Sequence, residues 1–484
     1  MSGSMMLKIV AAAAVLAAIL GGCATNPVTG QKELSIVTPA QELEIGKQGY
    51  GPVTAEYGIY DDAALSAYVN SIGQKVAHVS HLPNLEWHFT ILDDPTVNAF
   101  AMPGGYIYIT RGILPYLNSE AQLAGVLGHE IGHVTHRHSA AQMTQQQIFG
   151  VGLALGSIFS PTFARYSGAA QQALGLLFLK FSRTDESQAD ELGVDYATKA
   201  GYDPRDIPAT YAMLKRVSDQ SGQRLPGFLE THPDPGSRET VTRDLANQAV
   251  AGKTGLVINH DVYIRHMDNI VFGQDPRQGY FVGDDYFHPT LRFQLTFPAG
   301  WRHQDTHASV AAGEPNQAAV VQLATAQNAG NLTPEAYVAQ LAANKSITGF
   351  NGARETIGGY SAWVGHITVT DQNQAPATLD AAFIRKDAVL FQILGQSKQT
   401  GDANEQRIFT TMRSFRNLTD AARINVTPDR VRVSTVKTTG SFGTVATGLG
   451  ARQADLETDA IMNNVRTTDS VAAGKLVKVV TRLH

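Results

Sequence analysis

The chain has 484 residues, more than one compact core usually holds, so we expect two to four domains. Hydrophobic residues make up 43% and charged residues 17% of it, a composition too apolar for intrinsic disorder. The 38 basic and 43 acidic side chains give a net charge of −5, which argues against a nucleic-acid partner, and the single cysteine, Cys23, excludes an internal disulfide and a cysteine-based metal cluster.

Residues 1–22 have the pattern of a secretory signal peptide. Lys8 is their one charge, an apolar run follows it, and small residues come last. The run is too short to cross a bilayer by itself. The sequence Leu20-Gly21-Gly22-Cys23 resembles the bacterial lipobox, which implies cleavage before Cys23 and lipidation of this cysteine, and Ala24 implies transfer to an outer membrane. An ordinary signal peptide with an incidental cysteine is the alternative.

Residues 23–38 are polar and contain turn formers, so we interpret them as a tether, and residues 39–256 are expected to form an α-rich first domain. Apolar periodicity predicts its helices and alternation predicts its strands. The helices are expected in two pieces over 39–80, from Ser119 with Gln122 completing a capping box, and at about 168–200, 204–220 and 237–250; the strands are expected at 85–92 and 105–111.

Two segments of this domain keep two interpretations open. The apolar, glycine-rich stretch 148–160 is a packed helix or lid, or else a segment that contacts a membrane or a partner. The strand at 106–110 can accept a substrate peptide as an added strand if it lies at a sheet edge, and cannot if it is internal.

The rest of the chain is expected to form two smaller units. Residues 257–420 are predicted to form an α+β domain, because residues 290–420 alternate like strands, with helices near 333–344 and 403–414. Its segments 295–301 and 414–416 are weakly similar to the Mog1/PsbP-like sandwich. Residues 426–483 are expected as a small βααβ unit.

This last unit resembles the second half of a LysM glycan-binding module in its stretches 461–465 and 473–478. Thr439-Gly440-Ser441 stands in place of the usual Gly-Asp-Thr start of that module. No repeated period that would indicate a helical-repeat array is present.

The motif that carries chemistry is His129-Glu130-Ile131-Gly132-His133. On a helix its two histidines lie one turn apart on one face, so both imidazoles can reach one metal ion, and Glu130 can address a metal-bound water. A catalytic zinc needs three protein ligands and one open position. Glu186 and Asp190, four residues apart on a later predicted helix, can supply the third ligand and an acceptor that orients a ligating histidine.

The alternative for this motif is a surface helix with a histidine pair. The apolar residues around the motif and the acidic pair on the second helix argue against it. His136 and His138, which follow the motif, are interpreted as structural or solvated.

Three motifs together resemble the HtpX/BepA-like gluzincin metallopeptidases, a group that includes the CAAX prenyl proteases. They are Asn98–Gly105, the His-Glu-x-x-His helix and Ser182–Gly193, and the resemblance covers about residues 26–250. It implies one zinc ion per chain, bound by His129, His133 and Glu186, with Glu130 as the general base.

The segment Thr231-His232-Pro233, followed by Arg238, also resembles this family. The resemblance implies that His232 either occupies the open zinc position as a latch or assists the oxyanion, and that Arg238 supports either role. A helix-capping loop without catalytic contact is the alternative.

The resemblance implies a zinc metalloendopeptidase that hydrolyses misfolded or stalled envelope proteins, in protein quality control at the periplasmic face of the outer membrane. Its partners would be unfolded or misassembled envelope proteins and, through the lipid anchor, the membrane. Two alternatives are a latched metalloprotease that acts mainly as a chaperone or assembly factor, and a cell-wall-associated factor whose last unit binds peptidoglycan.

Overall fold

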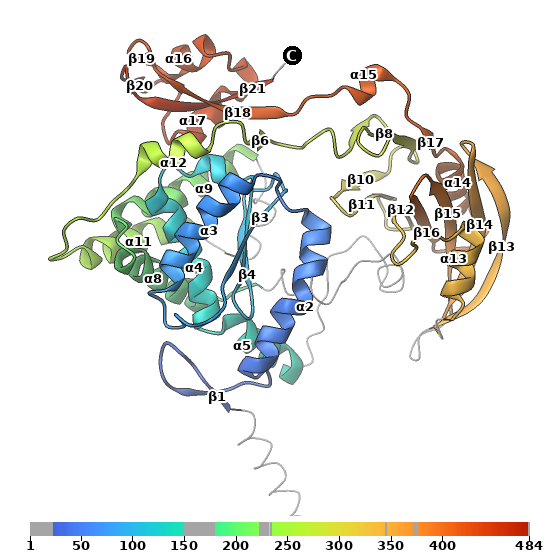
Figure 1. Cartoon of the computed structure of the whole chain (residues 1–484), viewed down its shortest axis with the longest axis horizontal. Helices are drawn as coiled ribbons and strands as arrows, with labels where there is room; N and C mark the ends of the chain where they lie inside the picture. The colour runs from blue at the N-terminus through green and yellow to red at the C-terminus, as the bar shows by residue number, and fades with distance from the viewer. Residues whose placement is uncertain are drawn as a thin grey trace, which may run out of the picture.

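The computed structural model describes residues 23–149, 180–221, 232, 235–343, 346–370 and 376–482. Figure 1 shows a helical part on the left, a β-rich part on the right and a small unit above the helical part. The signal segment 1–22 and all but the first two residues of the apolar stretch 148–160 lie outside the described residues. No helix among the residues described has both the length and the apolar character needed to cross a membrane.

The helical part is mixed α and β, as predicted. Its helices are α2 (Pro39–Tyr57), α3 (Ala63–Ala77), α4 (Glu120–Thr135), α5 (His138–Phe149), α8 (Arg183–Lys199), α9 (Pro208–Ser221), α11 (Pro235–Ala249) and α12 (His260–His266), with the short turns η1 (Leu114–Tyr116) and η3 (Pro204–Asp206). A hairpin of β1 (Cys23–Thr25) and β2 (Lys32–Leu34) precedes them, within the segment interpreted as a tether.

A three-stranded sheet lies beside α4 and resolves the question of the edge strand. Its order is β3 (His88–Leu92), β5 (Tyr106–Thr110) and β4 (Ala99–Met102), with β5 parallel to β3 and antiparallel to β4. β5 is therefore internal and cannot accept a substrate strand. Gly104 and Gly105 form the turn between β4 and β5 at φ of +80° and +91°, a region that side chains with a Cβ rarely adopt.

Helix α8 begins later than predicted. The expected helix over 168–200 lies outside the described residues at 168–179, and residues 180–182 are not helical, since the helix begins at Arg183. The Ser182 hydroxyl accepts the backbone N–H of Asp185, and the Asp185 carboxylate accepts that of Ser182, which closes a capping box. Ser182 and Asp185 therefore fix the start of α8, which apolar periodicity alone does not indicate.

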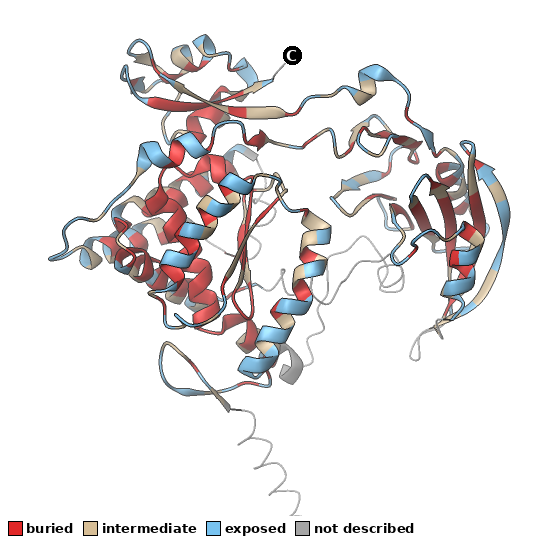
Figure 2. Cartoon of the chain, in the orientation of Figure 1, coloured by how far each residue is buried: buried red, intermediate tan, exposed pale blue. Residues whose placement is uncertain are grey.

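The start of α4 is correct, but its capping differs from the prediction. The Ser119 hydroxyl accepts the N–H of Gln122, whereas the Gln122 side chain accepts from the backbone of Asn118. In a capping box the Gln122 side chain would accept the backbone N–H of Ser119, but here it accepts that of Asn118, one residue earlier. All of α4 is buried, so it is the central helix of the domain (Figure 2).

The β-rich part is an antiparallel α+β domain, as predicted. Its larger sheet has the order β10 (Arg302–Asp305), β11 (Ser309–Gly313), β12 (Ala319–Thr325), β16 (Val389–Ser397), β15 (Ala377–Lys386), β14 (Tyr360–Val369) and β13 (Ile347–Ile357). Its smaller sheet has the order β17 (Arg416–Asn417), β9 (Phe293–Thr296), β8 (Asp285–His288) and β7 (Tyr280–Val282). Helices α13 (Pro334–Leu341) and α14 (Ala403–Arg413) accompany the larger sheet.

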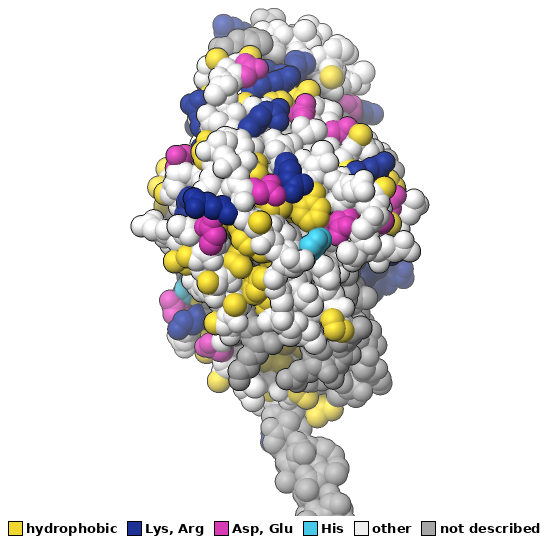
Figure 3. Space-filling model, turned by 90° about the vertical axis from the view of Figure 1, so that its right-hand side faces the viewer, with side chains coloured by type: hydrophobic (Ala, Val, Ile, Leu, Met, Phe, Trp, Pro, Cys, Tyr) yellow, Lys and Arg dark blue, Asp and Glu magenta, His cyan; other side chains and the backbone are white. Residues whose placement is uncertain are grey.

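This domain buries apolar side chains of its own on both faces of the larger sheet. Figure 3 views the molecule from the side of this domain, where basic and acidic side chains are interspersed.

The last unit packs onto the helical part. It contains β18 (Asp429–Thr435), β19 (Gly440–Ser441), α16 (Phe442–Gly448), η4 (Gln453–Asp455), α17 (Leu456–Met462), β20 (Ser470–Val471) and β21 (Leu476–Arg482), after the short α15 (Ala421–Ile424). β18 pairs with β21 and with β6 (Val271–Phe272). Val431, Ile461 and Val480 belong to the same apolar core as α4, and so do residues of α12, beyond the sequence-based boundary at 256.

A buried lysine lies at the contact between the last unit and the helical part. Lys478 on β21 is 0% exposed, and its Nζ donates to the carbonyl oxygens of Pro115 and Leu117, at 2.7 Å each, and to Oδ1 of Asn118 at 3.1 Å. Burial lowers the pKa of Lys478. The three acceptors nevertheless match the three N–H donors of an ammonium group, so they offset part of that penalty.

Lys478→Met should therefore destabilise the whole chain, because the two carbonyls and the amide oxygen lose their donor inside the contact. We expect a loss of about 2 kcal/mol in the free energy of unfolding, measured by urea denaturation. Lys475→Met, at an exposed position of the same unit, should change it little. An unchanged midpoint for both variants would contradict the role of Lys478.

A buried carboxyl on the same unit should make stability depend on pH. Asp459 on α17 is 0% exposed, its Oδ1 accepts the N–H of Val480 at 2.9 Å, and burial raises its pKa to about 7. The unfolded chain loses this proton near pH ~4, so between about pH 4 and 7 the folded state holds more protons and its stability falls as pH rises.

Asp459→Asn should remove this slope, which amounts to at most about 1.4 kcal/mol per pH unit. The free energy of unfolding at pH 5 and pH 8 measures it. Asp387→Asn, at an exposed turn carboxylate, is the matched control and should keep the slope of the parent chain. The interpretation fails if Asp459→Asn and the parent show the same difference between the two pH values.

Candidate metal centre

The centre depends on how closely α4 and α8 approach each other. A Cβ on Gly193 of α8 would lie 3.0 Å from the backbone nitrogen of His129, and a Cβ on Gly132 of α4 would lie 3.2 Å from Cα of Ala189. Larger residues at these positions would push the helices apart. Because both positions are glycine, the first turn of α8 brings Glu186 against the two histidines of α4.

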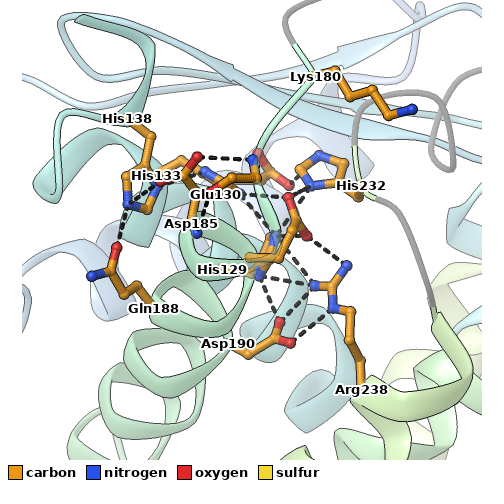
Figure 4. Close-up of polar contacts among 12 residues, drawn as sticks. His129, Glu130, His133, His138, Lys180, Asp185, Gln188, Asp190, His232 and Arg238 are labelled. Atoms are coloured by element: carbon orange, nitrogen blue, oxygen red, sulfur yellow. Dashed lines mark hydrogen bonds and ion pairs between the residues drawn. The ribbon is translucent and has the colours of Figure 1, made fainter. Parts of the chain in front are cut away.

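Four side chains from three segments converge at this point (Figure 4). His129 and His133 come from α4, Glu186 from α8, and His232 from the chain between α9 and α11. Their exposed fractions are 3%, 1%, 2% and 0%, and one potential ligand atom of each lies within 4.8 Å of the others. The structure therefore brings His232 to the same point as the three predicted ligands.

The spacing of the donor atoms fits a tetrahedral metal ion. His129 Nε2 lies 3.1 Å from His133 Nε2 and 3.3 Å from His232 Nδ1. The Glu186 carboxylate lies 2.9 Å from His232 Nδ1 and 3.6 Å from the Nε2 atoms of the other two histidines. Ligands bound at about 2.0–2.1 Å in a tetrahedron are about 3.3 Å apart. Three imidazoles and a carboxylate are also a donor set that zinc accepts.

Asp190 and Arg238 lie behind the donors as a buried ion pair. The guanidinium of Arg238 donates from Nη2 to Asp190 Oδ1 at 2.6 Å and from Nε to Asp190 Oδ2 at 2.8 Å, while its Nη1 lies 2.6 Å from Glu186. Asp190 Oδ1 also lies 2.9 Å from Nδ1 of His129. A carboxylate at this nitrogen holds the ring so that its Nε2 faces the other donors.

The charges of this pair explain the protonation of both carboxylates. Burial alone would raise the pKa of Glu186, but His232 and Arg238 outweigh it and lower that pKa. Burial would likewise raise the pKa of Asp190, and Arg238 lowers it well below its usual range. Burial lowers the pKa of His133, and the neighbouring His129 adds to this, so its ring stays neutral and able to bind a metal.

Glu130 faces the cluster from α4. It is 0% exposed, its Oε1 lies 3.7 Å from Nε2 of His232, and neither oxygen has a hydrogen-bond partner among the described residues. Burial raises the pKa of Glu130 more than His232 and His129 lower it. A buried carboxylate without a hydrogen bond is suited to accept a proton from a water molecule.

Two residues of the site were not identified from the sequence. His138, interpreted as structural or solvated, is buried, and its Nδ1 lies 2.9 Å from Nδ1 of His133. Tyr211 of α9 donates its hydroxyl hydrogen to Asp190 at 2.6 Å, and the guanidinium of Arg238 lies over its ring. Residue spacing in the sequence predicts neither contact. Arg137, at φ +60°, turns the chain just before His138. Tyr211 lies on a different helix from the histidines.

His136 holds the start of the described chain. It is buried, like His138, which fits the structural one of the two predicted interpretations and excludes the solvated one. Asn26, which is 1% exposed, donates from Nδ2 to the backbone oxygen of His136 at 3.2 Å. The β1–β2 hairpin therefore contacts the chain three residues after His133.

Residues 63–244 match peptidase family M48. The segment runs from the start of α3 into α11 and contains the candidate ligands, Glu130, Asp190, Tyr211 and Arg238.

Relatives of known function match the same half of the chain. The "Beta-barrel assembly-enhancing protease" of Escherichia coli is 32% identical over 235 residues, which is 46% of this chain and 47% of that protein. The "Mitochondrial metalloendopeptidase OMA1" of Arabidopsis thaliana is 30% identical over 231 residues, 45% of this chain and 46% of that protein. The matched part of the chain thus spans about half the length of these relatives.

Among solved structures, cyanobacterial PsbP (CyanoP) from Synechocystis sp. PCC 6803 aligns with 28% of this chain and 94% of its own, at 11% identity and a TM-score of 0.23. This score is too low to establish a shared fold.

Proposed function

We propose that the protein is a zinc-dependent endopeptidase, because residues 63–244 match peptidase family M48 and are similar to proteases of that kind. The observation that carries this proposal is the buried cluster of His129, His133, Glu186 and His232 beside the Glu130 carboxylate, which has no hydrogen bond among the described residues. A metal site for structure alone would not need a buried base next to it.

In the proposed mechanism His129, His133 and Glu186 would hold the metal. A bound zinc ion would supply a Lewis acid that polarises the scissile carbonyl and lowers the pKa of water. Glu130 takes a proton from the attacking water and returns it to the leaving amine. Asp190 keeps His129 oriented, and Arg238 neutralises the excess negative charge of Glu186 and Asp190.

We propose misfolded or stalled envelope proteins as substrates. The name of the Escherichia coli relative, which refers to β-barrel assembly, supports this class. The signal-like residues 1–22 and Cys23 support a lipid anchor at the periplasmic face of the outer membrane. The contact between Asn26 and His136 would then keep the peptidase domain close to that anchor.

The two other units support narrower interpretations. The antiparallel sheets of residues 280–417 support a Mog1/PsbP-like domain, and the two helices α16 and α17 between the paired strands β18 and β21 support a LysM-like unit. In this proposal the last unit, which shares a core with the peptidase domain, brings a cell-wall contact to the same body.

Glu130→Gln should abolish turnover and leave the metal bound, because it removes the base and no ligand. We expect the cleavage of casein by the chain lacking residues 1–22 to fall by about 10²–10⁴-fold. Metal analysis of the same samples should show unchanged zinc content. Glu239→Gln, on the surface of α11, is the matched control and should cleave like the parent. Casein cleavage by Glu130→Gln at the parent rate would refute the mechanism.

A second candidate function is a latched peptidase that acts mainly as a chaperone or assembly factor. The position of His232 favours it, since Nδ1 lies 2.9 Å from Glu186 and 3.3 Å from His129. Four protein ligands close a zinc site, whereas a catalytic site keeps one position open. Nε2 of His232 also lies 3.7 Å from Oε1 of Glu130. The imidazole therefore lies beside the base, where the attacking water would have to bind.

His232→Ala should therefore raise the casein cleavage rate several-fold with zinc still bound by three ligands. His260→Ala, an exposed histidine, is the control. A severe loss of cleavage with intact zinc content would instead show that His232 assists the transition state. The double variant Glu130→Gln/His232→Ala should be inactive. This result would show that any increase in casein cleavage by His232→Ala comes from the same centre.

A further inference from the structure

A second group of metal-binding side chains lies in the β-rich domain, apart from the peptidase residues. It consists of His366 on β14, Asp380 on β15 and Glu405 in the first turn of α14. One potential ligand atom of each lies within 4.8 Å of the others. We propose that these three side chains bind a divalent transition-metal cation that joins the larger sheet to α14.

The fold brings the three donors together from distant parts of the domain. His366 and Asp380 are directly opposed in the antiparallel pairing of β14 with β15, so their side chains leave the same face of the sheet. His366 Nδ1 lies 3.1 Å from Oδ1 of Asp380 and 3.8 Å from Oε1 of Glu405. These separations are close to those between neighbouring ligands of one ion.

Each donor is held in place by its surroundings. Asp402 caps α14 by accepting the N–H of Glu405 at 2.8 Å, and Glu405 Oε2 accepts the N–H of Gly401 at 2.5 Å. The ring of His366 packs edge-on against Phe409, one turn after Glu405, with ring centres 5.4 Å apart. The imidazole is therefore fixed so that Nδ1 faces the two carboxylates.

The electrostatics leave negative charge without a matching cation. Asp380 is 3% and Glu405 8% exposed, and in the described part of the chain their ion pairs are with His366 alone. Two buried carboxyl groups whose oxygens lie within 4.8 Å of one another, with one histidine as their partner, form a site that a cation can occupy.

The donor set favours a transition metal as the cation. One imidazole nitrogen and two carboxylate oxygens suit zinc or manganese, whereas calcium and magnesium prefer oxygen donors only. The side chain of His366 is 31% exposed, so solvent can reach the site and complete the coordination. Such an ion would cross-link β14, β15 and α14 and stabilise this domain.

The test is metal content of the chain lacking residues 1–22, equilibrated with ZnCl2 and MnCl2 and freed of excess metal by gel filtration. We expect two metal ions per parent chain and one in each of Asp380→Asn, Glu405→Gln and His366→Ala. Asp387→Asn, the exposed control, should keep two. Casein cleavage should stay within about two-fold of the parent in all four, because the peptidase centre is unchanged.

Thermal unfolding gives a second readout. Added zinc should raise the midpoint of the parent and of Glu130→Gln, but raise it less in Asp380→Asn, whose metal-free form should be at least as stable as the parent because one buried charge is gone. One metal per parent chain, or a second metal retained in all three variants, would overturn the proposal. If one variant fails to fold, the other two decide.

Discussion

The close packing of α4 against α8 is the constraint on which the candidate metal centre depends. Gly132 and Gly193 let the two backbones approach closely, since a Cβ at either position would lie only 3.0–3.2 Å from the backbone of the facing helix. At this distance Glu186 lies 3.6 Å from the Nε2 atoms of two imidazoles that are one turn apart on α4. Local helix geometry sets the spacing of the histidines, and helix packing sets the position of the carboxylate.

The buried charged side chains near this helix contact are paired with one another. Glu186 and Asp190 would be costly to bury alone, and Arg238, 6% exposed, contacts both. Tyr211 supports Asp190 from α9, so four helices contribute to one network. Arg238 therefore connects the stability of the domain with the orientation of His129. In the β-rich domain no arginine or lysine among the described residues forms an ion pair with Asp380 or Glu405. A bound cation would neutralise these two carboxylates there.

The molecule is also less modular than its sequence suggests. The last unit shares a core with the peptidase domain, and Lys478 donates to the loop just before α4. The β1–β2 hairpin contacts the other end of that helix through Asn26. The helix that carries His129 and His133 is thus held at both ends by segments far away in the chain.

The sequence by itself determined the candidate residues of the site and the type of most elements. His129, Glu130 and His133 follow from spacing along one helix, and the change from an α-rich to a β-rich part follows from periodicity, because these features depend on neighbouring residues. Only the tertiary structure decided that His232 lies on the metal-binding side, that His138 contacts His133 and that β5 is internal. These facts depend on contacts between segments tens to hundreds of residues apart, and no local pattern encodes such contacts.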